Sequence, residues 1–343
     1  MKLYLHIGMP KSASSTIQNF IYESRNELSV RDFLIPDFLG KKNHRMIFSF
    51  LKGKFGEYDA GIYLRNAKDG NEKNKIISRV EANIKKFLEA GQDYNKVIIS
   101  CEQLASLGQR EIQYLYDFIS PYFSSISVIV YFRRQDLMAV SGYNTQVISG
   151  RYKLFHDSFS FSSTPTPAFL YDKILQKWSN VFGESVIKVR TLDPEYTISG
   201  NVISDFQDAI GVSFPVSKSA ETKENSSLSA ATLEFVRCLN ERLSKENLDL
   251  YKQAGISGIT QPYAKKAKQL HARFYPGRES AERFYGLFDQ SNRMVANKWL
   301  GRNDLFSGDF SMYPEETIAP TDAEVKDAAI EFLVALLTSG DRD

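Results

Sequence analysis

The sequence predicts an α/β fold in which a parallel β-sheet is flanked by helices and followed by a mostly helical C-terminal extension. Three observations predict it. Short apolar, β-branched segments alternate with segments of helical periodicity over the first 245 residues. Gly8, Glu102 and Arg133 lie within two residues of the ends of three of these apolar segments. The chain has 343 residues, 43% of them hydrophobic, which is enough for one large core with a substantial extension.

Four apolar segments are expected to form the sheet, with one further candidate. A continuous run such as Ile126 to Phe132 suits a parallel strand buried on both faces. Ligands of such sheets bind outside the carboxyl ends of the strands. Gly8, Glu102 and Arg133 all fall at such ends, so we expect three separated segments to converge on one crevice. The expected strands are 3–7, 96–100, 126–132 and 186–190, with a short one at 33–35.

The loop after the first expected strand has the composition of a phosphate-binding loop. Gly8 and Pro10 force a turn, and Lys11 adds a positive charge. A helix that begins at such a loop directs unpaired N–H groups and the positive end of its dipole at the ligand. The sheet is therefore expected to be P-loop-like. The hydroxyl residues of the loop are Ser12, Ser14, Ser15 and Thr16, and helical spacing follows at Ile17, Phe20, Ile21 and Leu28.

The spacing of the loop departs from that of nucleoside-triphosphate loops, G-x-x-x-x-G-K-[ST]. Lys11 follows Pro10, and no glycine lies between Gly8 and Gly40. The string HIGMPKSASST, residues 6–16, instead resembles the P-K-[ST]-G-[ST]-[ST] loop of sulfotransferases that use 3′-phosphoadenosine 5′-phosphosulfate (PAPS). Ala13 stands where that family normally has glycine. The resemblance implies that PAPS, and 3′,5′-diphosphoadenosine as product, bind at Lys11, Ser12, Ala13, Ser14, Ser15 and Thr16.

A second motif follows the strand expected at 126–132. An arginine at the carboxyl end of a strand offers a phosphate bidentate, charge-assisted hydrogen bonds. In the resembled family such an arginine, with a serine eight residues later on the next helix, holds the 3′-phosphate. Arg133 and Ser141 have that spacing. Taken alone, the same residues would suit an arginine pair, with Arg134, that caps a sheet edge and a serine on a helix surface.

The resemblance continues with weaker motifs, and similar bacterial sulfotransferases match in order over roughly residues 1–243. Asp205-Phe206 with Gly211 is expected to form a short helix and turn after the strand at 186–190. Residues 225–229, NSSLS, are expected to open a helix that extends through Leu243. Residues 288–300 resemble a helix near the end of the bacterial proteins.

Glu102 is the expected catalytic base. It follows the strand at 96–100, where a carboxylate reaches the mouth of the sheet. Sulfuryl transfer needs a base, a cation on the leaving phosphate and donors around the equatorial oxygens. Glu102, Lys11 and the loop with Ser14 and Ser15 would supply these three, and a glutamate base resembles the carbohydrate-type enzymes. Glu102 would also suit a helix N-terminus without any catalytic role. His6 and His44 are rival bases, with His44 in an unassigned loop on the acceptor side.

The resemblance therefore implies a sulfotransferase that moves the sulfuryl group of PAPS to a hydroxyl of a carbohydrate or glycan. Two alternatives remain at the level of the sequence. One is a P-loop-like nucleotide triphosphatase or kinase in which Glu102 binds Mg²⁺. The other is a non-catalytic adenosine-phosphate binding protein, to which the extra methyl group of Ala13 points.

Residues 1–245 are expected to form the nucleotide-binding α/β domain, and residues 246–343 a helical extension packed on the same core. Within the first part, 41–74 and 150–167 lack strong periodicity and are candidate acceptor-binding insertions. The extension is rich in basic residues, which a solvated helix face would explain. These residues are Lys265, Lys266, Lys268, Arg273 and Arg278.

Composition favours a cytoplasmic protein. Cys101 and Cys238 are too few for a disulfide framework and match no metal-ligand spacing, so no metal site is expected. The expected strand begins almost at Met1, which leaves no room for a cleaved signal, and no apolar stretch approaches the roughly 20 residues of a membrane span. A peripheral association with a membrane-linked acceptor is compatible with this. The formal net charge of +2 does not favour a nucleic-acid partner.

Overall fold

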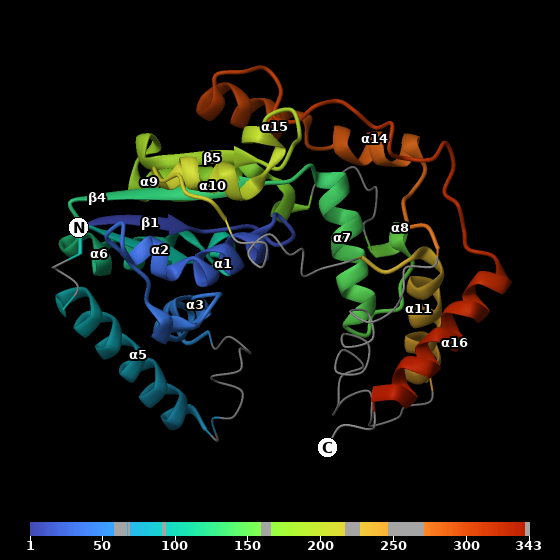
Figure 1. Cartoon of the computed structure of the whole chain (residues 1–343), viewed down its shortest axis with the longest axis horizontal. Helices are drawn as coiled ribbons and strands as arrows, with labels where there is room; N and C mark the ends of the chain where they lie inside the picture. Colours follow the sequence, from blue (N-terminus) through green and yellow to red (C-terminus); the bar gives the residue numbers. More distant parts are fainter. Residues whose placement is uncertain are drawn as a thin grey trace. The chain divides into compact units, whose positions relative to one another are not determined.

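The computed structural model describes residues 1–57, 67, 69–90, 94–158, 166–216, 227–245 and 271–339. The chain divides into two compact units, each assembled from several chain segments (Figure 1). The first unit comprises Met1–Arg133, Thr166–Thr222 and Gln290–Ser307. The second unit comprises Arg134–Pro165, Lys223–Asp289 and Gly308–Asp343.

The first unit contains the predicted parallel sheet, and the α/β fold class is confirmed. Within the described residues the sheet has five strands in the order β2-β3-β1-β4-β5, all of them parallel. Their bounds are β1 Lys2–His6, β2 Phe33–Leu34, β3 Lys96–Ser100, β4 Ser125–Phe132 and β5 Ile187–Thr191. Each lies within one residue of the expected strand. Because β1 lies between β3 and β4, the segments that follow those two strands flank the loop after β1.

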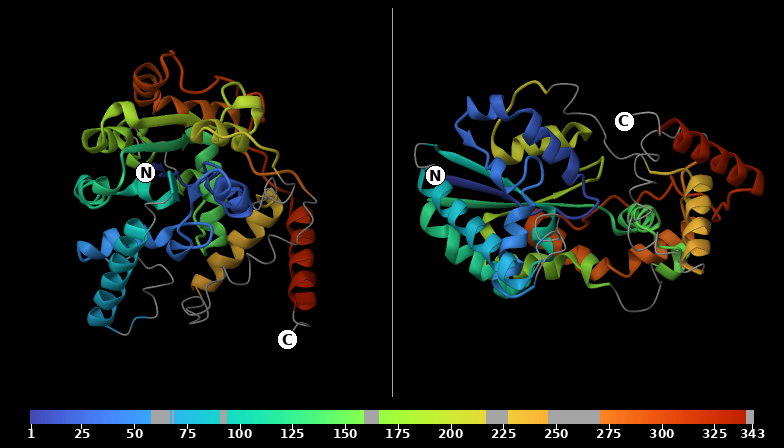
Figure 2. Two further views of the ribbon diagram at one scale, coloured as in Figure 1. Left: turned by 60° about the vertical axis from the view of Figure 1, so that its left-hand side comes forward. Right: turned by 90° about the horizontal axis from the view of Figure 1, so that it is seen from below.

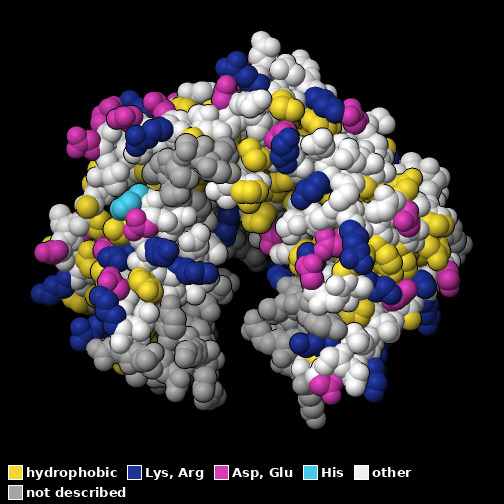
Figure 3. Space-filling view, turned by 180° about the vertical axis from the view of Figure 1, so that it is seen from behind, with side chains coloured by type: hydrophobic (Ala, Val, Ile, Leu, Met, Phe, Trp, Pro, Cys, Tyr) yellow, Lys and Arg dark blue, Asp and Glu magenta, His cyan; other side chains and the backbone are white. Residues whose placement is uncertain are grey.

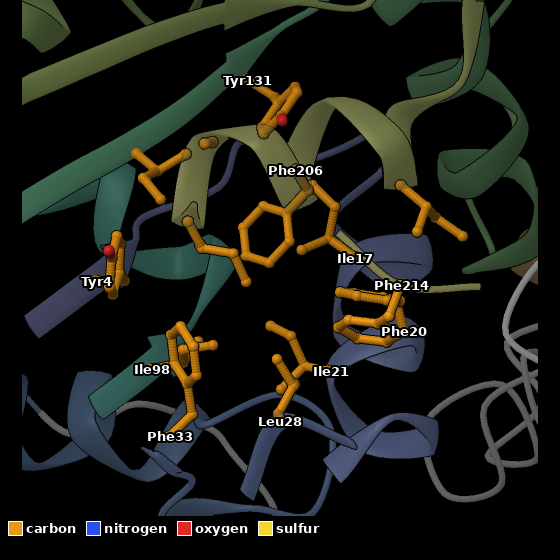
Figure 4. Close-up of a cluster of buried hydrophobic side chains, with 14 residues drawn as sticks. Tyr4, Ile17, Phe20, Ile21, Leu28, Phe33, Ile98, Tyr131, Phe206 and Phe214 are labelled. Atoms are coloured by element: carbon orange, nitrogen blue, oxygen red, sulfur yellow. The ribbon is translucent and has the colours of Figure 1, made fainter. Parts of the chain in front are cut away.

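Side chains of successive strand residues alternate between the two faces of the sheet. On one face Tyr4, Ile98 and Ile129 pack against the helices α1 (Ser14–Glu23) and α10 (Val202–Ile210). Figure 4 shows Phe206 at the centre of this cluster and the ring of Phe20 stacked on that of Phe214, with centroids 5.8 Å apart. The helices α6 (Gln109–Ile119) and α9 (Tyr171–Phe182) pack on each other on the opposite face (Figure 2). The covered sheet therefore leaves its strand ends as the place for a ligand.

The remaining elements of the first unit follow the predicted spacing. The predicted helix around Asp205-Phe206 is α10, which the side chain of Asn201 caps and which ends at Gly211 with φ of 72°. The other helices are α2 Arg25–Ser29, α3 Arg45–Lys54, α5 Gly70–Ala90 and α15 Asp289–Val295, whose residues from 290 on belong to this unit. Short 3-10 helices lie at 37–39, 102–106, 120–122, 167–169, 184–186 and 198–200, with a π-helical turn at 296–300.

The second unit is helical in its described part. Its helices are α7 Gln135–Ile148, α8 Phe155–Ser158, α11 Ala230–Lys245, α14 Arg278–Gly286 and α16 Asp322–Ser339. Tyr143 and Val147 of α7 pack with Leu233 and Val236 of α11 in one buried cluster. The helix predicted to open at residues 225–229 thus begins at Ala230, and residues 225 and 226 lie outside the described residues.

Parts of the predicted insertions at 41–74 and 150–167, and the basic residues 265, 266 and 268, also lie outside the described residues. Figure 3 shows Lys and Arg side chains mixed with Asp and Glu side chains on the face that it displays. In the described ranges, no helix combines the length and the apolar content needed to cross a bilayer.

Candidate active site

The loop after β1 turns through three positive φ angles. Gly8, Lys11 and Ala13 have φ of 55°, 65° and 56°. For a residue with a Cβ this left-handed conformation costs about 1–2 kcal/mol. The Met9 carbonyl holds the turn, because it accepts hydrogen bonds from the Ser12 N–H at 3.2 Å and from the Ser14 hydroxyl at 3.0 Å. The positive φ of Ala13 explains why glycine would suit position 13. From the sequence alone, the expected difference between alanine and glycine was only the extra methyl group.

The start of α1 has the features of an anion site. Its N-cap is Ala13, which has no side chain able to accept from the first N–H groups of the helix. The Ser12 side chain is completely buried, and its Oγ has no hydrogen-bond partner among the described residues. A buried hydroxyl without a partner is destabilising. An uncapped helix start beside such a hydroxyl suits an anionic ligand that accepts from both.

The other predicted loop residues lie in the first turn of α1. Ser14 is buried, Thr16 is half-buried and Ser15 is exposed. Ser15 and Thr16 therefore remain available for a ligand at the helix start, whereas the Ser14 hydroxyl already donates to the Met9 carbonyl.

Glu102 packs directly against the loop. It opens the 3-10 helix Glu102–Ser106 at the end of β3. A Cβ placed on Gly8 would lie 2.7 Å from the Glu102 Cα and 2.9 Å from its Cβ, which is closer than real side chains approach. This contact requires glycine at position 8, and the φ of 55° also favours it. The Cys101 N–H donates to the His6 carbonyl at 3.0 Å and extends the pairing of β1 with β3 into the site.

Arg133 reaches the same loop from the end of β4. Its Nη1 donates to the Lys11 carbonyl at 3.2 Å, and its own carbonyl accepts from the Tyr171 hydroxyl of α9 at 2.6 Å. The neighbouring Arg134 belongs to the second unit and is buried there. Its guanidinium donates to both Asp136 oxygens, at 2.9 and 3.0 Å, and covers the Phe310 ring. Of the predicted arginine pair, the structure therefore places Arg133 at the loop and gives Arg134 partners of its own.

Lys11, Glu102 and Arg133 interact electrostatically. Burial lowers the pKa of the Lys11 ammonium below its usual value, although the Glu102 charge acts against this and the Arg133 charge adds to it. Burial raises the pKa of the Glu102 carboxyl above its usual range, opposed by Lys11, by a hydrogen bond from Gln103 and by Arg45. A cation and a carboxylate with such shifts, at the ends of adjacent strands, are typical of functional sites.

Three residues near Glu102 were missed by the sequence analysis. Gln103 Nε2 donates to Glu102 Oε1 at 3.1 Å, and Asn43 Nδ2 donates to Gln103 Oε1 at 3.2 Å. Arg45, in the first turn of α3, contributes positive charge near Glu102. The adjacency of Gln103 to Glu102 was a usable signal in the sequence. Nothing in the sequence indicates that residues 43 and 45 return to the end of β3.

His44 lies at the end of β3, as the N-cap of α3. It is completely buried. Its ring Nδ1 accepts from the backbone N–H of Ser100 at 3.0 Å, and the backbone N–H of His44 donates to the Ser100 carbonyl at 2.9 Å. Burial lowers its pKa to about 4. Its use as a base remains a prediction, and the observed contacts fix the chain before α3.

His6 is also buried. Its Nδ1 lies 2.8 Å from the Ser100 Oγ, and its ring packs edge-on against Tyr131 and Phe206. Ser141 is half-buried on α7 of the second unit, so its contact with a 3′-phosphate remains a prediction.

Comparisons with known proteins give limited similarity. No protein-family model matches the chain. A curated protein of Archaeoglobus fulgidus, described as uncharacterized, is 27% identical over 238 residues, which are 68% of this chain and 62% of that protein. The chain thus spans less than two thirds of that relative's length. The crystal structure of a sulfotransferase from Alicyclobacillus acidocaldarius aligns with a TM-score of 0.39 and 18% identity, covering 73% of this chain and 98% of that one. Neither similarity assigns this chain to a family, so its function rests on the residues of the site.

Proposed function

We propose that the protein is a PAPS-dependent sulfotransferase of the family that its loop resembles, acting on a hydroxyl of a carbohydrate or glycan. One observation carries the proposal: a loop lysine, a strand-end carboxylate and a strand-end arginine interact around a left-handed turn at the start of a helix. These residues are Lys11, Glu102 and Arg133.

The donor would bind by its anionic groups. The N–H groups at the start of α1 suit the 5′-phosphosulfate, because the first N–H groups of a helix have no partner within the helix and no side chain caps this one. The buried Ser12 hydroxyl suits it as well, because this hydroxyl has no hydrogen-bond partner among the described residues. Arg133 would bind the 3′-phosphate with its guanidinium, which is fixed near the loop by its bond to the Lys11 carbonyl. The acceptor would approach on the side of Glu102.

In the transfer step, the acceptor hydroxyl attacks the sulfur and its proton passes to Glu102. A bond forms between the acceptor oxygen and sulfur, and the bond between sulfur and the bridging oxygen breaks with its electron pair on the 5′-phosphate. The products are the sulfated acceptor and 3′,5′-diphosphoadenosine. Lys11 would stabilise the negative charge that develops on the bridging oxygen. The raised pKa of Glu102 makes it a stronger base than an exposed glutamate.

Ligand binding tests the donor. We expect 3′,5′-diphosphoadenosine to raise the melting temperature without added metal, and to do so more than 5′-AMP or ATP with Mg²⁺. A specific ligand at a hundredfold excess over its Kd stabilises the folded state by about 2.7 kcal/mol. Greater stabilisation by ATP with Mg²⁺ would instead support a kinase or triphosphatase.

Substitution of the base tests the chemistry. Glu102→Gln keeps the size of the side chain but cannot accept a proton, so transfer of radiolabelled sulfate should fall by about 10²–10⁴ while nucleotide affinity is retained. His44→Asn is the matched control, because Asn Oδ1 can accept from the Ser100 N–H as His44 Nδ1 does. Normal transfer in Glu102→Gln would exclude Glu102 as base. Tight nucleotide binding with no transfer to any acceptor would support a non-catalytic binding protein.

A further inference from the structure

The Gln103 amide lies between the proposed base and the chain segment before α3. Its Nε2 donates to Glu102 Oε1 at 3.1 Å. Its Oε1 accepts from Asn43 Nδ2 at 3.2 Å and from the Cys101 thiol at 3.3 Å. The three bonds connect the carboxylate to a residue 59 positions earlier in the chain, across the end of β3.

These partners favour one orientation of the amide. If the Gln103 oxygen and nitrogen were exchanged, the amide oxygen would face the Glu102 carboxylate and the NH₂ group would face two other donors. The contact with Glu102 would become repulsive, because an ionised carboxylate only accepts. The carboxylate therefore selects the orientation that presents an N–H to it, and the donors Asn43 and Cys101 on the other side of the amide fit the same orientation.

Asn43 is itself held firmly. The next residue, His44, exchanges two hydrogen bonds with Ser100, the last residue of β3. The turn before it is tight, since a Cβ on Gly40, at φ of 128°, would lie 2.2 Å from the Asn43 carbonyl oxygen. The Asn43 side chain thus projects from a fixed backbone position, and Gln103 has a fixed support on the side away from Glu102.

We propose that Gln103, supported by Asn43, is a positioning residue that holds the Glu102 carboxylate for proton transfer. The bond restrains the rotation of the carboxylate and occupies Oε1, which leaves Oε2 to take the proton of the acceptor. The segment 40–44 thereby acts on the reaction through Gln103. This inference rests on the proposed role of Glu102 as base.

The titration of Glu102 tests the hydrogen bond without any turnover. In protein labelled with ¹³C-glutamate, the side-chain carboxyl resonance of Glu102 is assigned by its loss in Glu102→Gln and followed against pH by NMR. A hydrogen bond to the charged form lowers the pKa of a carboxyl, so Gln103→Met should move the titration to higher pH. Asn43→Ala should move it in the same direction by less, and Gln113→Met, at an exposed glutamine on α6, should leave it in place.

Kinetics tests whether the bond matters for the reaction. Gln103→Met should lower kcat by about tenfold to a hundredfold, the rate equivalent of one hydrogen bond to a charged group. The acidic limb of the pH profile should move to higher pH in parallel with the titration. In a Glu102→Gln background the same substitution should have no further effect, because residues that act through one another are not additive.

The possible results separate the two proposals. An unchanged Glu102 titration and acidic limb in both Gln103→Met and Asn43→Ala, with Glu102→Gln inactive, would overturn the positioning role alone. A further loss from Gln103→Met in the Glu102→Gln background would also overturn it. Normal transfer by Glu102→Gln would overturn the proposed base, whatever Gln103 does to the titration.

Discussion

Two buried histidines close to the candidate active site should make the first unit lose stability in mild acid. Burial lowers the pKa of His6 to about 3 and that of His44 to about 4. In the unfolded chain both would titrate near 6.5. As the pH falls below 6.5, the unfolded chain binds protons that the folded chain does not, so the free energy of unfolding decreases. The decrease stops for each histidine once the pH passes below its pKa in the folded state.

The size of the effect follows from these values. One pKa unit corresponds to about 1.4 kcal/mol, and pH 5 is about 1.5 units below the unfolded value, so each histidine should cost about 2 kcal/mol between pH 8 and pH 5. The two together should cost about 4 kcal/mol, a large part of the roughly 5–15 kcal/mol that stabilises a typical domain. Glu102 acts in the opposite direction because burial raises its pKa. A histidine variant therefore gives a cleaner measurement than the wild type alone.

Urea unfolding followed by tryptophan fluorescence measures this directly. Both tryptophans of the chain, Trp178 and Trp299, belong to the first unit, so the signal reports on the unit that contains the histidines. His44→Asn keeps an acceptor for the Ser100 N–H and removes the titration. It should lose about 2 kcal/mol of the pH dependence between pH 8 and pH 5. His156→Asn, at an exposed histidine of α8, is the matched control.

An equal dependence on pH in the wild type and in His44→Asn would refute the reasoning. It would mean that His44 is protonated as readily in the folded protein as in the unfolded chain. A buried ring whose Nδ1 accepts from the Ser100 N–H should have a lower pKa in the folded protein than in the unfolded chain. Such a result would therefore mean that either the burial of the ring or this hydrogen bond is wrong.

Three further predictions concern the loop and its arginine. Lys11→Ala should abolish transfer of radiolabelled sulfate while the urea midpoint stays unchanged, and persistent transfer would contradict the role of the lysine. Arg133→Ala should weaken binding of 3′,5′-diphosphoadenosine by about 1.5–3 kcal/mol and binding of 5′-AMP by less, as measured by calorimetry; equal losses would show that Arg133 does not contact the 3′-phosphate. Ala13→Gly should raise the free energy of unfolding by about 1 kcal/mol, because glycine adopts a φ of 56° without strain; a lower urea midpoint would contradict this.

The sequence predicted the parts of the site that depend on local patterns. The strands were predictable because buried parallel strands are continuous β-branched runs, as in Ile126 to Phe132. The loop at Gly8 and the strand-end residues Glu102 and Arg133 followed from the same pattern, since parallel strands bring their carboxyl ends to one edge.

The rest of the site depends on contacts between distant segments. His44 seemed to lie in a free loop because its two bonds to Ser100 span 56 residues. The Asn43 bond to Gln103 spans 60 residues and has no local signature. The left-handed conformation of Ala13 contradicts the ordinary preference of alanine, so the surrounding structure, and not the residue, determines it.

The contact between Gly8 and Glu102 has a consequence for how the proposed sulfotransferase could acquire new acceptors. Since no side chain fits between these residues, the loop that would receive the donor and the carboxylate that would receive the proton form one inseparable piece. Random change at position 8 would be eliminated with the fold, before any new activity could be selected. Substitutions that change the acceptor would therefore have to lie in residues near the Glu102 carboxylate on the side away from Gly8. Under the proposed function, a directed-evolution library for altered acceptors belongs outside residues 6–16, for example at Arg45, whose charge acts on Glu102.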